Sequence, residues 1–167
     1  KYIFNMEPSK PFFVDTALKA GIIAGVLDAT SASIQYYLLT EKNPALVFKF
    51  IASAVFGNQV NTSGTLFGWA AVGLVFHFII AILFAFFFFL SYKFIKKILP
   101  NWILAGIVYG LIVWSIMNLI VVPLFFGNPF VFDFKKTAIA ALILIVAIGL
   151  PVSYFANRYF KQQNATA

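Results

Sequence analysis

Residues 21–35 read GIIAGVLDATSASIQ, and this stretch decides the fold. It places an acidic residue, Asp28, in the middle of a segment that is otherwise apolar enough to cross a membrane. A charged carboxylate at that depth costs about 2.5–3.5 kcal/mol on insertion scales, so it should face protein or a wet cavity rather than lipid. We therefore expect a membrane helix that turns one polar side toward the interior of a bundle.

That polar side is made of small and polar residues that recur at helical spacing. Its members are Gly21, Gly25, Asp28, Ala32 and Gln35. Gly21 and Gly25 form a G-x-x-x-G pair, which lets a neighbouring helix approach closely. A second pair, Gly106 and Gly110, occurs in a later apolar segment. We expect the bundle to pack through these two small faces.

Composition places the whole chain in the membrane class. Of its 167 residues, 62% are hydrophobic, 10% are charged and 22 are Phe, which fits one polytopic membrane domain over residues 1–167 in contact with the lipid bilayer. The net charge of +7 comes from basic residues that flank the apolar segments, a pattern that predicts membrane anchoring and no nucleic-acid partner. The sequence has no Cys, which excludes a disulfide framework and a cysteine nucleophile.

Four apolar segments are long enough to cross a bilayer, so the expected fold class is all-α with four transmembrane helices. The expected spans are about residues 16–39, 65–92, 102–126 and 137–159. A shorter segment, about residues 44–56, is interrupted by Lys49 and predicts one interfacial or re-entrant helix on the outer side. Its expected apolar face is formed by Leu46, Val47, Phe50, Ile51, Ala54 and Val55. Pro123 and Pro151 are expected to bend the third and last spans.

Four spans place both ends of the chain on one side of the membrane, and the basic residues indicate which side. On the side of the termini the sequence has Lys1, Lys10, Lys19, Lys93, Lys96, Lys97, Arg158 and Lys161. The other side has Lys42, Lys49, Lys135 and Lys136. Eight against four predicts termini in the cytoplasm, because cytoplasmic loops carry the excess of Lys and Arg.

An internal repeat is a further hypothesis. AGIIAG at 20–25 aligns with AGIVYG at 105–110, and Asn43-Pro44 aligns with Asn128-Pro129 at the same offset of 85. Both halves would then run span, outward turn, span. The alternative is chance, since Ala, Gly and Ile are common in membrane helices and Asp28 aligns with Val113.

His77, the single histidine, lies near the middle of the second span, at about the depth of Asp28 in the first. An Asp–His pair in a membrane interior has the composition of a proton relay, because His titrates near neutral pH. The alternative is a structural pair that only fixes helix packing. Gln35 and Asn118 are further intramembrane polar residues, for which we expect interhelical hydrogen bonds of about 0.6–2 kcal/mol rather than substrate contacts.

Other kinds of site find no support in the sequence. A single His cannot supply two haem ligands, no His, Cys or carboxylate cluster has metal spacing, and there is no P-loop, dinucleotide fingerprint or G-x-S-x-G. We therefore expect no catalytic residue, no metal and no cofactor, while an enzymatic activity, on lipids for example, stays open as a third and weakest class of function.

Two classes of function remain. The favoured class is a non-enzymatic accessory or scaffolding protein that binds other membrane protein subunits or another copy of itself. The other is a small transporter or proton-coupled channel that uses Asp28 and His77.

Four stretches carry a resemblance to a known group of proteins. They are GIIAGVLDATSASIQYYL at 21–38, NPALVFKFIASAVFG at 43–57, GLVFHFIIAILFAFFF at 73–88 and AGIVYGLIVWSIMNLIVVPL at 105–124. Together they resemble small, uncharacterised bacterial inner-membrane proteins, broadly of the YagU-like kind. The resemblance covers roughly residues 20–125 and implies a bacterial cytoplasmic membrane protein, but it implies no activity.

Overall fold

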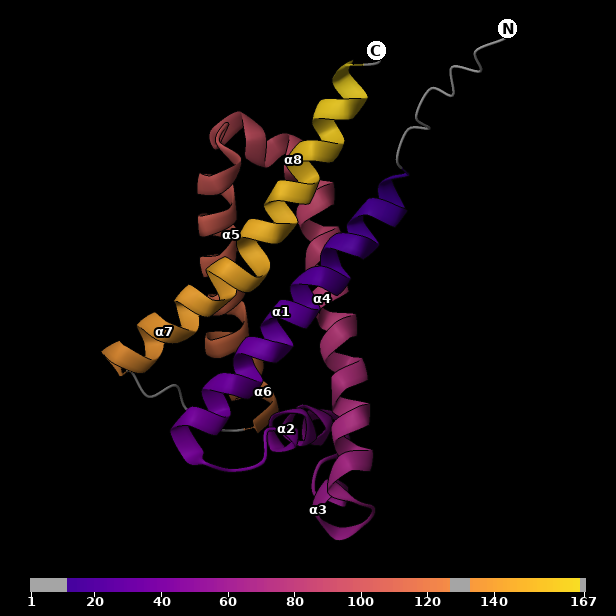
Figure 1. Ribbon diagram of the computed structural model, residues 1–167, viewed down its shortest axis with the longest axis vertical. Helices are drawn as coiled ribbons and strands as arrows, with labels where there is room; N and C mark the ends of the chain where they lie inside the picture. Colours follow the sequence, from indigo (N-terminus) through magenta and orange to yellow (C-terminus); the bar gives the residue numbers. More distant parts are fainter. Residues whose placement is uncertain (1–11, 127–132, 166–167) are drawn as a thin grey trace, which may run out of the picture.

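A computed structural model describes residues 12–126 and 133–165, and within these ranges all regular structure is helical (Figure 1). The α-helices are α1 (Phe13–Thr40), α2 (Ala45–Phe56), α3 (Gln59–Thr62), α4 (Leu66–Ile98), α5 (Trp102–Ser115), α6 (Val122–Phe126), α7 (Phe134–Leu144) and α8 (Leu150–Ala165). Two π-helical segments, η1 (Ile116–Val121) and η2 (Ile145–Gly149), join α5 to α6 and α7 to α8.

Four of the resulting helices are long and apolar enough to cross a membrane. They run over Phe13–Thr40, Leu66–Ile98, Trp102–Phe125 and Phe134–Ala165, and Ala45–Phe56 is a shorter apolar helix. The predicted fold class, all-α with four spanning helices and one short helix, is therefore confirmed. The second helix continues six residues beyond the predicted end at residue 92. These additional turns carry Lys93, Lys96 and Lys97 and follow the apolar part of the helix.

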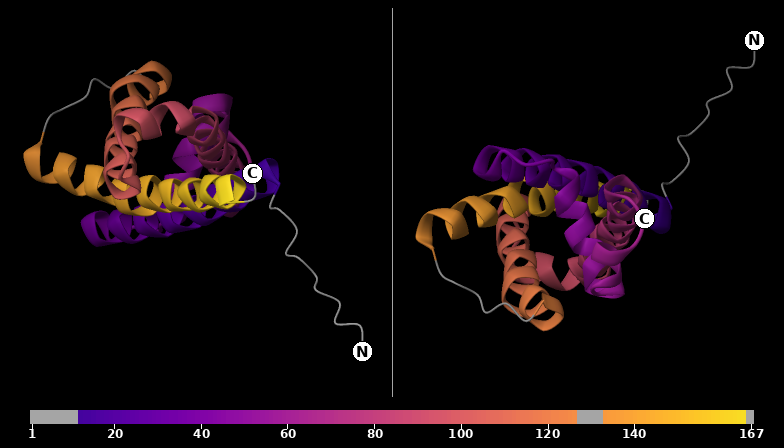
Figure 2. Two further views of the ribbon diagram at one scale, coloured as in Figure 1. Left: turned by 90° about the horizontal axis from the view of Figure 1, so that it is seen from above. Right: turned by 90° about the horizontal axis from the view of Figure 1, so that it is seen from below.

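The four spans pack as two pairs: α1 with α4, and α5 with the helix formed by α7, η2 and α8. α1 contacts α4 and α8, while α5 contacts α7, η2 and α8. Figure 2 shows α1 and α8 lying beside one another, with α4 and α5 on the same side of them. The start of α1 and the end of α8 lie at one end of the bundle, here called the terminal end, and α2, α3 and the start of α7 lie at the other, the α2 end (Figure 1).

The first glycine row lies against α4. A Cβ placed on Gly21 would lie 2.7 Å from the Cα of Ile82, and one on Gly25 would lie 2.9 Å from Cδ1 of Phe78. These distances are well below an ordinary carbon contact of about 3.5–4.0 Å, so the absent side chains allow the close approach.

The second glycine row lies against a different neighbour. A Cβ on Gly106 would lie 2.9 Å from the carbonyl oxygen of Gly149, and one on Gly110 would lie 2.5 Å from the Cα of Ile145. The two small faces thus do not meet each other; each packs the first span of its half of the chain onto the second span of that half. The repeat hypothesis stays a prediction, and one of its markers, Asn128-Pro129, lies outside the described residues.

Both π-helical segments precede a proline. η1 ends at Val121, two residues before Pro123, and η2 ends at Gly149, two residues before Pro151. Proline lacks an N–H and its ring crowds the preceding turn, and a wider π turn relieves this conflict without ending the helix. The structure thus has a π turn just before each proline at which the sequence predicts a bend.

The terminal half of the bundle is closed by a hydrophobic core. Its large buried side chains are Phe88, Phe89, Tyr92, Tyr109, Val113, Ile148 and Val152. Three hydroxyl groups join helices within this half. Tyr92 donates to Oδ1 of Asn157 at 3.0 Å, Tyr109 to the carbonyl oxygen of Phe84 at 2.6 Å, and Ser153 to that of Trp102 at 2.7 Å. The apolar contacts and these hydrogen bonds hold α4, α5 and α8 together in this half.

Helix α2 crosses α4 at Gly73, where a Cβ would overlap the carbonyl oxygen of Phe48. Ala52, one turn later on the same face of α2, is fully buried. Phe48 and Ala52, which meet α4, lie outside the predicted apolar face, on which Phe50 and Val55 are 44% and 57% exposed. Gly73 has no side chain, so the backbone of α2 can approach α4 closely on the face that carries the small residue Ala52.

Candidate functional site

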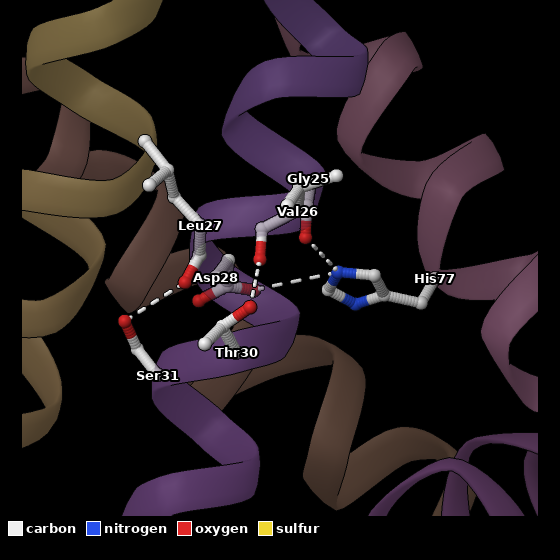
Figure 3. Close-up of polar contacts among 7 residues, drawn as sticks. All are labelled: Gly25, Val26, Leu27, Asp28, Thr30, Ser31 and His77. Carbon is white, nitrogen blue, oxygen red and sulfur yellow. Dashed lines mark hydrogen bonds and ion pairs between the residues drawn. The ribbon is translucent and has the colours of Figure 1, made fainter.

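The candidate site lies between α1 and α4 in the middle of the bundle, where the structure brings Asp28 and His77 together (Figure 3). Their Oδ2 and Nε2 atoms are 3.9 Å apart. The approach follows from the glycine row, because Gly25 lets α4 come close enough for Nε2 of His77 to lie 3.0 Å from the Gly25 carbonyl oxygen.

This contact fixes the tautomer of the imidazole ring. A carbonyl oxygen can only accept a hydrogen bond, so Nε2 of His77 must donate to Gly25 and therefore carries a proton. In the neutral ring the next proton then binds at Nδ1, which no residue in ranges 12–126 and 133–165 hydrogen-bonds. Once Nδ1 is protonated, the ring becomes a cation facing the Asp28 carboxylate.

The surroundings of the pair are mostly apolar. The side chains of His77 and Asp28 are only 12% and 16% exposed. The rings of Phe48 and Phe78 meet the imidazole edge-on, at centroid distances of 6.0 and 5.7 Å. A charge interaction of this kind is stronger than in water, because fewer solvent dipoles screen it.

Neighbouring hydroxyl groups do not satisfy the carboxylate. Thr30 and Ser31 donate to carbonyl oxygens of their own helix, each at 2.8 Å (Figure 3). Within the described residues the Asp28 carboxylate accepts no hydrogen bond, and His77 is its ion-pair partner. Since 3.9 Å exceeds hydrogen-bond distance, the two groups lie within ion-pair range but share no direct hydrogen bond.

A second polar feature opens one helical turn beyond Asp28. It is a cavity of about 350 Å³ at the α2 end, here called the polar cavity, formed by α1, α2, α5, η1 and α7. Its lining residues are Ala32, Gln35, Tyr36, Leu39, Val47, Trp114, Asn118, Lys136, Thr137 and Ala140. Two of the predicted intramembrane polar residues, Gln35 and Asn118, thus share one cavity, and Ala32 connects its wall to the turn that carries Asp28.

The predicted interhelical hydrogen bonds of Gln35 and Asn118 are not formed in this structure. Asn118 donates instead to the carbonyl oxygen of Trp114 in its own helix at 3.0 Å, and Gln35 makes no hydrogen bond among the described residues. Both residues line the polar cavity, which leaves the remaining donors and acceptors of their amides for water or a ligand.

Lys136 and Thr137 were missed as cavity residues by the sequence reasoning. Lys136 was counted only as a charge that orients the protein. The usable signal was its position at the start of the last span, at the same membrane level as Gln35 near the end of the first. Lys136 also lies 4.0 Å from Asp133, one turn earlier, so its charge is partly paired.

Among the described residues, no group of three His, Cys, Asp or Glu side chains could hold a metal ion. The fold and the site therefore define an integral membrane protein with four candidate spans and an interior carboxylate–imidazole pair.

The chain belongs to the family described as conserved membrane protein YqhR, which matches residues 5–166. This match supports the resemblance to uncharacterised membrane proteins, but it does not support the YagU-like attribution. No curated protein and no solved structure matches the chain.

Proposed function

We propose that this protein is a small proton-coupled transporter or channel in which Asp28 and His77 hold the transferred proton. The observation that carries the proposal is the 3.9 Å approach of the carboxylate to the imidazole in the middle of two spanning helices. Carboxylates and histidines inside membrane bundles typically belong to ion pathways and proton relays.

Stability gives little reason for such a pair. Taking both charged groups out of water costs several kcal/mol per ion, and well-packed apolar residues often replace a buried pair without loss of stability. The functional groups of Asp28 and His77, by contrast, suit proton transfer, because a carboxylate and an imidazole can each bind and release a proton.

The polar cavity supports access to the pair from the α2 end. The polar cavity opens at the α2 end and ends one turn short of Asp28. The terminal half is closed by its hydrophobic core, in which Phe88 and Val152 are fully buried. A proton or substrate would thus reach the pair from the α2 end, and release at the terminal end would need a rearrangement of that core.

We further infer that the terminal end faces the cytoplasm of a bacterial inner membrane. This inference is supported by the excess of Lys and Arg on that side, eight residues against four in the full sequence. The α2 end and the polar cavity would then face outward, and the pair would draw its protons from outside the cell.

The test is proton flux into proteoliposomes, followed with a trapped pH-sensitive dye. Asp28→Asn should abolish flux driven by a pH gradient while the protein still elutes as a folded species in size-exclusion chromatography. Asp15→Asn is the matched control, because Asp15 is an exposed carboxylate in the same helix, 2.8 Å from Lys19. The control should keep wild-type flux; wild-type flux in Asp28→Asn would overturn the proposal.

A purely structural pair gives a different pattern. Removing one member of a buried pair costs about 3–5 kcal/mol, so Asp28→Asn would lower the thermal stability and His77→Gln would partly restore it. The wild-type protein would then show no flux at all.

A second candidate function is an accessory or scaffolding subunit. It is favoured by an open apolar groove of about 430 Å³ along α5 and η1, an apolar surface against which a helix of another subunit or of a second copy could pack. The groove is lined by Val108, Leu111, Ile112, Ser115, Ile116, Leu119 and Ile120. Copurification from native membranes separates the candidates: a stoichiometric large partner favours the accessory role, and a small oligomer with proton flux favours transport.

A further inference from the structure

A cleft of about 280 Å³ lies at the terminal end, between the last turns of α4 and α8. It is lined by Tyr92, Lys93, Lys96, Lys97, Phe160 and Asn164. The three lysines stand at positions i, i+3 and i+4 and therefore share one side of α4. This cationic cleft is far from the Asp28–His77 pair and plays no part in the transport proposed above.

The floor of the cationic cleft is rigid. Tyr92 is only 2% exposed, and its hydroxyl donates to Oδ1 of Asn157 in α8 at 3.0 Å. Its ring stacks on that of Phe160, with centroids 4.9 Å apart and an interplanar angle of 15°. The ammonium group of Lys96 lies 5.9 Å from the centre of the Tyr92 ring. A fixed aromatic surface thus holds at least one of the lysines over the opening.

The chemistry of the lining selects an anion. It contains three ammonium groups, one carboxamide from Asn164 and no carboxylate. Lysines in a last helical turn also offset the helix dipole, but that role requires neither a cleft nor an aromatic floor. Several ammonium donors around a small concave space suit a phosphate, whose oxygens accept charge-assisted hydrogen bonds.

An apolar strip on the outer side of the same helix ends at Lys97, at one edge of the cleft. Leu83, Phe87, Leu90 and Phe94 follow one another at spacings of four and three residues, and they are 62%, 62%, 72% and 68% exposed. Lys97, three residues after Phe94, is the next position of this strip. The strip is roughly 16 Å long at 1.5 Å per residue, about half of the 30 Å hydrocarbon core.

We propose that the cationic cleft binds the phosphate headgroup of an anionic phospholipid in the leaflet at the terminal end. The acyl chains lie along the apolar strip, which matches one leaflet in length, and the headgroup phosphate meets the lysines. A free phosphate would use the cleft but has no use for the strip. Basic pockets at the ends of membrane helices bind anionic lipids through this combination of charge and depth.

The experiment is native mass spectrometry of the full chain released from detergent, with phosphatidylglycerol or phosphatidylcholine added. We expect phosphatidylglycerol to stay bound to the wild-type protein at lipid concentrations where phosphatidylcholine does not. Replacing Lys93, Lys96 and Lys97 together by Gln should weaken phosphatidylglycerol binding roughly fivefold per lysine, or on the order of a hundredfold in total. Equal binding by wild-type and triple variant, or equal binding of both lipids, would overturn the proposal.

The matched control removes the same charge at the α2 end, by replacing Lys42, Lys135 and Lys136 with Gln, and should keep wild-type lipid binding. If this control loses as much affinity as the cleft variant, net charge and not the cleft explains the binding, and the proposal fails. Inorganic phosphate separates the two sources of the anion, because it should compete only weakly with a lipid that is also held by the strip. Full displacement by phosphate, together with no effect of Phe94→Ala on lipid retention, would assign the cleft to free phosphate instead.

Discussion

Adding one methyl group at Gly110 probes how closely α5 and η2 must approach. In Gly110→Ala the new Cβ would lie 2.5 Å from the Cα and 2.9 Å from the backbone nitrogen of Ile145. Carbon atoms prefer separations of about 3.5–4.0 Å, so the two backbones must move apart by about 1 Å. Neither atom of Ile145 can rotate away, because both belong to the backbone.

The expected magnitude follows from two opposing effects. Overpacking a closely packed interface costs about 1–3 kcal/mol, whereas replacing a helical Gly by Ala gains about 1 kcal/mol in helix propensity. Gly68→Ala provides the matched control, because its Cβ would meet only the Oγ1 atom of Thr65, at 3.2 Å, on the surface. The propensity gain is common to both variants, so the difference between them isolates the overpacking term.

The assay is thermal unfolding of the detergent-solubilised protein, followed by the loss of the monodisperse peak in fluorescence-detected size-exclusion chromatography. The free energy of unfolding of Gly110→Ala should be about 1–3 kcal/mol lower than that of Gly68→Ala. For a chain of this size, the unfolding temperature should then be roughly 2–12 °C lower. If Gly110→Ala is as stable as Gly68→Ala, the close contact between α5 and η2 does not exist in the folded protein, and the packing argument is refuted.

Three further outcomes are expected. In the first glycine row, Gly25→Leu should lower the unfolding temperature, because a Cβ there would already lie 2.9 Å from a ring carbon of α4, while the exposed Phe87→Leu should be nearly silent. Ser153→Ala should cost about 1 kcal/mol by removing a 2.7 Å hydrogen bond between α8 and α5, whereas Ser115→Ala, whose hydroxyl bonds its own helix, should cost less; equal losses would contradict this. The native sequence has no Cys, so an impermeant thiol reagent should label Lys42→Cys in intact cells, and labelling only after lysis would reverse the inferred topology.

The sequence predicted the spans because length and hydropathy are enough to identify a membrane helix. It also indicated the depths of Asp28 and His77, since each lies half-way along an apolar segment. Depth alone says nothing about the direction in which a side chain points around its helix. The structure adds that direction. Gly25 has no side chain, so α4 can approach closely, and the Gly25 carbonyl oxygen accepts a hydrogen bond from Nε2 of His77 at 3.0 Å.

Other features depend on helix partners, which a single sequence does not reveal. The two glycine rows predict close packing, but only the structure shows that Gly110 faces Ile145 in η2 while Gly25 faces α4. In the same way, Lys136 lies about one hundred residues after Gln35 in the chain, and the two share the polar cavity only because α7 returns to the end of α1. The face of α2 that packs against α4 was likewise not predictable, because Gly73, its contact on α4, lies in another helix.

The π turns before Pro123 and Pro151 have a mechanical consequence. A π turn holds one residue more than the α-helical turn it replaces, and each residue of an α-helix corresponds to a rotation of about 100°. If the surplus residue moved along η1, the side chains it passed would swivel by that angle while both helix ends stayed where they are. Asn118, which lies within η1, would then rotate its side chain into or out of the polar cavity.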